Sequence, residues 1–154
     1  MNPVNYIAED AEIGWMTTIW HFATVLSKAR IGNQCSVGSH AEVGARCIIG
    51  DGSRISAHVF LAPGTLIGQN VFIGPGAVFC DDKYPSVDKT KYVPEPVVVH
   101  DGASIGAGAV ILPGVTIGAN AMIGAGAVVT VDVPANSTFV GLPARQHPRL
   151  AAVS

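Results

Sequence analysis

A period of six residues runs through most of this chain and constrains its fold more than any other feature. Large apolar side chains recur every six residues from Ile7 to Phe79, and a second series with the same spacing runs from Val99 to Val129. Glycine often follows the apolar residue, and a small residue often lies four positions after it, as Ala11 follows Ile7. An α-helix repeats near 3.6 residues and a simple strand at 2, so neither produces this period.

Hexapeptide periods are typical of solenoids in which short parallel strands stack coil upon coil. Each hexad forms one flat side, and three sides close a triangular coil of about eighteen residues. The apolar residue and the small residue both point into the coil, which predicts that Cys35 and Cys47 belong to the core. We therefore expect an all-β fold, a parallel β-helix of hexapeptide repeats, as one domain over residues 1–154 with coils about 4.8 Å apart.

One polar segment interrupts the repeat. Phe79 and Val99 are twenty residues apart rather than eighteen, and the Pro-rich residues 81–96 between them carry two tyrosines and several charges. We expect this segment to leave the solenoid as one protruding loop, and long loops in compact domains are often functional. The repeat is lost again from Ala135 to Ser154, which predicts a tail that ends the stack.

Composition excludes several classes of protein. Hydrophobic residues make up 49% of the chain and charged residues 13%, with a net charge of −2, so neither a disordered chain nor a nucleic-acid-binding protein is expected. Residues 103–131 are uncharged and long enough to cross a bilayer, but their six glycines and Pro113 assign them to the solenoid instead of a membrane span. Three cysteines without a CxxC pair, and Met1–Asp10 without signal-peptide character, predict a cytoplasmic protein.

The repeat resembles that of the left-handed β-helix acyltransferases. Residues 105–118 and 123–130, with Gly141–Arg145, are similar to the members that use acetyl-CoA. Ile19–Phe22 and Phe79–Pro85 resemble the bacterial nucleotide-sugar N-acetyltransferases, which acetylate the 3-amino group of UDP- or dTDP-linked amino sugars for surface polysaccharides. The resemblance implies a left-handed parallel β-helix, acetyl-CoA as cosubstrate, a nucleotide-linked amino sugar as acceptor, and a homotrimer with active sites between subunits.

The loop departs from the pattern of that family at three positions. The family usually reads Phe-Thr-Asn-Asp-x-x-Pro-Arg, whereas this chain has Cys80 for Thr, Asp81 for Asn and Ser86 for Arg. Asp81 keeps a polar group but adds a charge. The loss of the arginine at Ser86 removes a usual substrate contact, which implies a different sugar.

The candidate catalytic residues are His40, His58 and Asp81. Amide formation needs a neutral amine and a path for its proton, which an imidazole or a carboxylate provides. His40 and His58 are eighteen residues apart, so we expect their rings to stack on one corner. The next member of that column is Gly76, close in sequence to Asp81, so we expect all three groups to converge on one groove. The ordinary alternatives are solvated corner histidines and an aspartate in a turn.

The same resemblance implies further contacts with the two substrates. Acceptor contacts are expected from His21, Asp82 and Tyr84. Acetyl-CoA contacts are expected from a set of residues in the C-terminal repeats and from a guanidinium near the CoA phosphates: Gly106, Ala107, Ala125, Thr130 and Arg145. No metal site is predicted.

Two other activities fit the same fold. An O-acetyltransferase acting on a sugar or small-molecule hydroxyl would depend more strongly on a histidine base, because a hydroxyl needs deprotonation more than an amine does. A zinc lyase of carbonic-anhydrase type would need three histidines around one metal, and no histidine pair five residues apart completes such a set. The polar loop and the C-terminal motif disfavour a purely structural solenoid.

Overall fold

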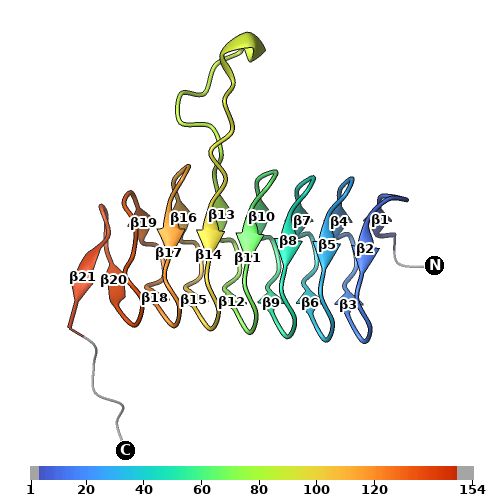
Figure 1. Ribbon diagram of the computed structural model, residues 1–154, viewed down its shortest axis with the longest axis horizontal. Helices are drawn as coiled ribbons and strands as arrows, with labels where there is room; N and C mark the ends of the chain where they lie inside the picture. Colours follow the sequence, from blue (N-terminus) through green and yellow to red (C-terminus); the bar gives the residue numbers. More distant parts are fainter. Residues whose placement is uncertain (1–3, 149–154) are drawn as a thin grey trace, which may run out of the picture.

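A computed structural model describes residues 4–148, which form a triangular β-solenoid with one protruding loop (Figure 1). Short strands lie on three sheets that run the length of the molecule, and there is no α-helix among the described residues. The predicted left-handed parallel β-helix of hexapeptide repeats is confirmed. Within residues 4–148, no helix is long and apolar enough to cross a membrane.

The three sheets take successive strands in turn. Sheet A contains β1 (Tyr6–Ile7), β4 (Thr24–Val25), β7 (Glu42–Val43), β10 (Phe60–Leu61), β13 (Val78–Phe79), β16 (Val110–Ile111) and β19 (Val128–Val129). Sheet B contains β2 (Glu12–Ile13), β5 (Arg30–Ile31), β8 (Ile48–Ile49), β11 (Leu66–Ile67), β14 (Val98–Val99) and β17 (Thr116–Ile117). Sheet C contains β3 (Thr18–Ile19), β6 (Ser36–Val37), β9 (Arg54–Ile55), β12 (Phe72–Ile73), β15 (Ser104–Ile105), β18 (Met122–Ile123), β20 (Thr138–Val140) and β21 (Arg145–His147).

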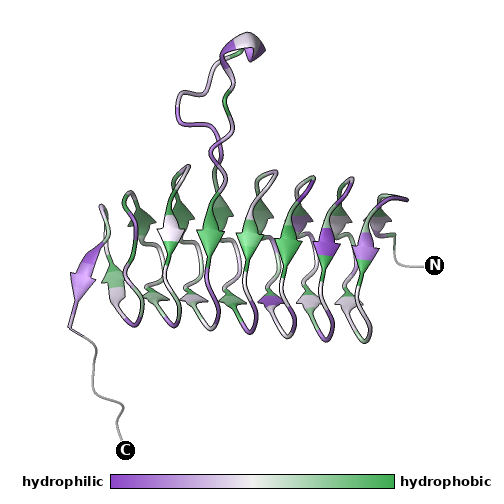
Figure 2. Cartoon of the chain, viewed as in Figure 1, coloured by the Kyte–Doolittle hydropathy of each residue, from purple (hydrophilic) through white to green (hydrophobic). Residues whose placement is uncertain are grey.

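The repeat determines which side chains enter the core. Strands pair in parallel one coil apart, as Ile7 lies opposite Val25, eighteen residues later. The second residue of each strand faces inward and is buried through the middle coils, while the first faces outward. Cys35 and Cys47 fill the small inward position and are buried as expected, and burial raises the pKa of the Cys47 thiol to about 11. Figure 2 shows apolar residues concentrated on the strands and hydrophilic residues at the tip of the loop.

The loop leaves the solenoid between β13 and β14, at the corner where sheet A meets sheet B (Figure 1). Ile67 pairs with Val99, 32 residues later rather than eighteen, so the insertion is fourteen residues long. Sequence analysis compared the twenty-residue spacing from Phe79 to Val99 with a full coil of eighteen residues, which suggested an excess of only two. That estimate was wrong, because Phe79 and Val99 end adjacent sides of the same coil. A single 3-10 turn, η1 (Lys89–Lys91), forms at the tip.

The described part of the C-terminal tail, residues 135–148, first extends the stack and then turns back on it, and residues 149–154 lie outside the described residues. Thr138 in β20 pairs in parallel with Met122, so the segment that begins at residue 135 adds one more strand to sheet C. The chain then turns back, and β21 pairs antiparallel with β20, placing Gln146 opposite Phe139. Phe139, the middle residue of β20, is buried.

Candidate active site

Two corners of the solenoid carry most of the residues singled out from the sequence. We call the corner between sheets C and A the histidine corner and the corner between sheets A and B, where the loop begins, the loop corner. Equivalent positions of successive coils at the histidine corner are occupied by Phe22, His40, His58, Gly76, Gly108 and Gly126.

The first half of this column is a stack of rings. The rings of His40 and His58 lie 5.0 Å apart between centroids and only 3° from parallel, as the eighteen-residue spacing predicts. Phe22 stacks on the other face of His40, with centroids 5.0 Å apart. The backbone fixes this arrangement, because both histidines have left-handed conformations with φ of 59° and the His58 amide donates to the Ser39 carbonyl at 3.0 Å. All three side chains remain exposed.

The second half of the column is bare backbone. A Cβ atom added to Gly76, Gly108 or Gly126 would have no heavy atom within 4 Å beyond its chain neighbours. These three glycines therefore form an open strip over three coils, which we call the glycine strip, and His58 lies at its N-terminal end. Ala107 and Ala125, expected to contact acetyl-CoA, are exposed beside it. A long, thin ligand lying along this strip would meet backbone and only short side chains such as those of Ala107 and Ala125.

Asp81 lies at the base of the loop, at the loop corner. Its carboxylate accepts a hydrogen bond from the Tyr92 hydroxyl, and its carbonyl accepts one from the Glu95 amide at 2.8 Å. The hydrogen bond to Asp81 is the main reason that the pKa of Tyr92 rises to about 12. Together these bonds join the two ends of the loop.

One chain does not bring Asp81 together with the histidines. His58 precedes β10 at one end of the sheet A side, whereas Asp81 follows β13 at the other end. The expectation that both imidazoles and the carboxylate converge on one groove therefore fails within a single chain. Its physical reason is that β13 carries the chain across a whole side of the triangle between Gly76 and Asp81.

The expected acceptor contacts are divided between the two corners. His21 lies at the histidine corner, edge-on to Phe22 with ring centroids 6.4 Å apart. Asp82 and Tyr84 lie in the loop, where the Asp82 carboxylate accepts a hydrogen bond from the Tyr84 amide at 3.0 Å. The Tyr84 side chain is 79% exposed.

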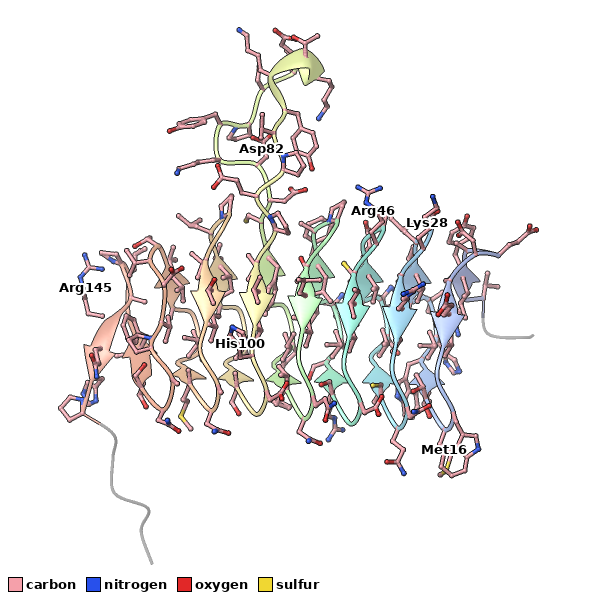
Figure 3. The ribbon with its side chains drawn as sticks, viewed as in Figure 1. Met16, Lys28, Arg46, Asp82, His100 and Arg145 are labelled. Carbon is pink, nitrogen blue, oxygen red and sulfur yellow. The ribbon has the colours of Figure 1, made fainter. Side chains whose placement is uncertain are left out.

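The expected acetyl-CoA contacts are dispersed as well. Gly106 borders the histidine corner. A Cβ there would lie 2.4 Å from the Ala125 nitrogen, so the close stacking of the coils is sufficient to explain this glycine without a contact to acetyl-CoA. Thr130 follows β19 at the loop corner. Arg145 begins β21 at the C-terminal end of the solenoid, and its guanidinium donates to the Ala144 carbonyl at 2.9 Å (Figure 3).

Sequence analysis overlooked two exposed cations at the loop corner. Lys28 and Arg46 project from the same edge as the loop that carries Asp82 (Figure 3). They are eighteen residues apart, like His40 and His58, so the repeat predicts that they lie next to one another on successive coils. Among the described residues, no group of three histidine, cysteine, aspartate or glutamate side chains could hold a metal ion.

Comparison with known proteins matches the repeat to a family model. Residues 28–63 and 96–130 match the model described as bacterial transferase hexapeptide (six repeats). A search of curated proteins finds no match.

Three solved structures are similar to this chain, and the first two share its fold. WeeI from Acinetobacter baumannii AYE is 28% identical over 92% of this chain and 57% of its own, with a TM-score of 0.50. UDP-N-acetylglucosamine acyltransferase from Campylobacter jejuni is 18% identical over 95% of this chain and 73% of its own, with a TM-score of 0.56. A perosamine N-acetyltransferase from Caulobacter crescentus, solved with CoA and GDP-perosamine, is 24% identical over 95% of this chain, with a TM-score of 0.40. The chain spans 57% of the length of the perosamine enzyme and of WeeI.

Proposed function

We propose that this chain, a protein of hexapeptide repeats of the bacterial transferase type, moves an acetyl group from acetyl-CoA to the amino group of a UDP- or dTDP-linked amino sugar. One observation carries the proposal: His58 lies at the end of the glycine strip, with its ring exposed. The strip suits the long pantetheine arm of CoA, and an imidazole at its end suits proton removal beside the thioester. Both substrates are cytoplasmic metabolites, so the proposal includes a cytoplasmic location.

The residues along the strip would hold acetyl-CoA by its shape. Gly76, Gly108 and Gly126 leave room for the arm, and Ala107 and Ala125 form its low walls. At the far end of the solenoid, the exposed guanidinium of Arg145 would contact phosphate groups, for which its planar fork is well suited.

In the reaction, His58 accepts the proton that the amine must lose. The acceptor nitrogen forms a bond to the acetyl carbonyl carbon, the carbon–sulfur bond breaks, and the amine proton passes through His58 to the departing sulfur. His40 acts as a positioning residue, because its parallel ring restrains the plane of the His58 ring. The products are an amide and free CoA thiol.

We further propose a homotrimer in which the loop corner of one subunit lies against the histidine corner of the next. Asp81 would then accept a hydrogen bond from the acceptor amine and hold it close to His58 of the neighbouring chain. The two corners lie at opposite ends of one side in a single chain, so a site that uses both requires two chains. Cyclic association provides such a site three times in one assembly. Sedimentation at the chain mass of 15.8 kDa would contradict the trimer.

The test is CoA thiol release with acetyl-CoA and a panel of UDP- and dTDP-linked amino sugars. We expect one acceptor to support turnover, and we expect His58→Asn to lower kcat/KM about a hundredfold or more, within the usual range for a general base. His100→Asn is the matched control, because His100 is an exposed histidine outside the histidine corner. Full activity of His58→Asn would refute its assignment as the base.

O-acetylation is the second candidate function. The observation that favours it is the imidazole at the end of the glycine strip, because a hydroxyl acceptor needs a base more than an amine does. Product chemistry separates the two candidates. Hydroxylamine cleaves an acetyl ester and leaves an acetamide intact, so a product that survives hydroxylamine supports N-acetylation.

A further inference from the structure

The loop corner carries a second charged feature that the proposed chemistry does not use. Lys28 and Arg46 occupy the same position of successive coils, with left-handed φ values of 58° and 59°, and the Arg46 amide donates to the Ser27 carbonyl at 2.9 Å. Successive coils are about 4.8 Å apart, so the backbone holds these two side chains next to one another. Figure 3 shows both on the edge from which the loop rises.

Neither cation forms an ion pair within the part of the chain that the structure describes, although the Asp10 carboxylate lies near enough to Lys28 for the two charges to attract one another. Neither side chain forms a hydrogen bond or an ion pair with residues 4–148. The neighbouring charges are already engaged: Arg30 pairs with Glu12 at 3.4 Å. The Asp10 carboxylate accepts from the Ser27 hydroxyl at 2.7 Å and from the Lys28 amide at 3.2 Å. Two like charges at this spacing repel one another, and an anion bound between them would attract both and offset that repulsion.

An apolar surface lies directly beside the cations. Lys28, Arg30, Arg46 and Ile48 line one shallow cleft of about 260 Å³ together with Asp10 and Glu12. Ile48 is 46% exposed, and its partner on the next coil, Leu66, is 39% exposed. A ligand that fits this corner would therefore combine a double negative charge with an uncharged ring system.

We infer that Lys28 and Arg46 bind the diphosphate of a nucleoside diphosphate, with the nucleoside over Ile48 and Leu66. A diphosphate offers two cations on successive coils more negative charge and more acceptor oxygens than a carboxylate or a single phosphate does. Arginine and lysine are the side chains that phosphate groups recruit most often. This inference rests on the proposed function for the identity of the ligand, because a nucleotide-linked sugar carries such a diphosphate. CoA also carries one, so the test separates the two sources.

Isothermal titration calorimetry with inorganic pyrophosphate, UDP, dTDP and GDP tests the site without catalysis. We expect the Kd of pyrophosphate and of the preferred nucleotide to rise about tenfold in Lys28→Ala and in Arg46→Ala, and further in the double variant, because each loses a charge-assisted hydrogen bond. Arg54→Ala is the matched control, since Arg54 is an exposed cation on sheet C, and its Kd values should match wild type. Unchanged pyrophosphate and nucleotide binding in the double variant would overturn the inference.

Titration with acetyl-CoA and with dephospho-CoA, which keeps the diphosphate of CoA, identifies the source of the diphosphate. We expect both to bind wild type and the double variant equally, and we expect dephospho-CoA not to displace UDP. Weaker acetyl-CoA binding in the double variant, with nucleotide binding unchanged, would assign the cations to CoA and overturn the inference.

Turnover on an amino sugar by a wild-type protein that binds no pyrophosphate would refute this site but leave the proposed function intact. Pyrophosphate binding that depends on Lys28 and Arg46, without any turnover, would support this site but refute the proposed function. Unchanged melting temperatures show that the variants fold.

Discussion

His58 lies where the sheet A side of the solenoid begins, and Asp81 lies where that side ends. The two residues therefore project from different corners of the same chain. Any site that contains both is assembled from two copies, with consequences that experiments on mixed assemblies can detect.

Mixed assemblies of two inactive variants should recover activity. We expect His58→Asn and Asp81→Ala to be weak alone, because each removes one half of every site. When the two chains are unfolded and refolded together in equal amounts, about a quarter of the sites receive both native residues if the site spans two subunits. Thiol release by the mixture should therefore reach about a quarter of the wild-type rate. A mixture no more active than its components would contradict a shared site.

Replacing His58 with phenylalanine separates stacking from proton transfer. Phe22 already stacks on His40 with centroids 5.0 Å apart, so a benzene ring at position 58 should stack in the same way. We expect His58→Phe to keep the wild-type melting temperature but to lose activity about a hundredfold or more, as His58→Asn does. Retained activity would mean that the ring, and not its nitrogen, is what the site needs.

A side chain on the glycine strip should obstruct acetyl-CoA. Gly108 has a φ of 66°, a conformation that asparagine tolerates, as Asn136 with a φ of 60° shows in this chain. We expect Gly108→Asn to raise the KM for acetyl-CoA about tenfold or more while leaving the KM for the acceptor within about twofold. Gly64→Asn at the loop corner is the control for backbone strain, since its Cβ would make an ordinary contact of 3.5 Å with Pro96. An equal effect of both variants would exclude steric obstruction.

The Tyr92 hydroxyl should ionise only at high pH because it donates a hydrogen bond to Asp81. Alkaline titration at 295 nm, taken as wild type minus Tyr92→Phe, should have a midpoint near pH 12 because of the hydrogen bond to Asp81. In an Asp81→Ala background the midpoint should fall toward the ordinary tyrosine value of about 10. The raised pKa means that this bond stabilises the loop below about pH 10 and that the stabilisation is lost as the pH rises to about 12.

The thiol of Cys47 should resist modification in the folded protein. It is fully buried and its pKa is raised to about 11, so little reactive thiolate exists at pH 8. Cys80 is only half-buried, although burial and the neighbouring Asp81 raise its pKa as well. A thiol reagent at pH 8 should therefore label Cys80 first and reach Cys47 only after denaturation. Rapid labelling of Cys47 in the native state would contradict this packing.

The repeat allows the residues that stack at each corner in successive coils to be predicted from the sequence. A strict period of six fixes which residues are inward, and three sides per coil fix which residues stack, so the pairing of His40 with His58 followed from their spacing alone. Lys28 and Arg46 have the same eighteen-residue spacing, so their stacking is equally predictable. Proton transfer points to imidazoles and carboxylates, so the reaction chemistry gives no reason to single out a lysine and an arginine.

The loop shows where sequence reasoning ends. Gly76 and Asp81 are close in sequence, yet β13 separates them by one full side, and nearness along the chain did not translate into nearness in space. The hydrogen bond from Tyr92 to Asp81 joins residues of a segment without a repeat, so no period constrained it. The length of the insertion was misjudged for a related reason, since twenty residues can be divided between solenoid and loop in more than one way.

The antiparallel pairing of β21 with β20 has a consequence for association at the C-terminal end of the molecule. A stack of parallel strands presents an unfinished edge to which another copy can add, and such edges promote fibre growth. β21 reverses the strand direction and places Arg145, Gln146 and His147 on that edge. An incoming coil would need a parallel, apolar template and meets a hydrophilic strand of opposite polarity instead. This strand therefore protects the sheet C edge against end-to-end addition of another coil at this end.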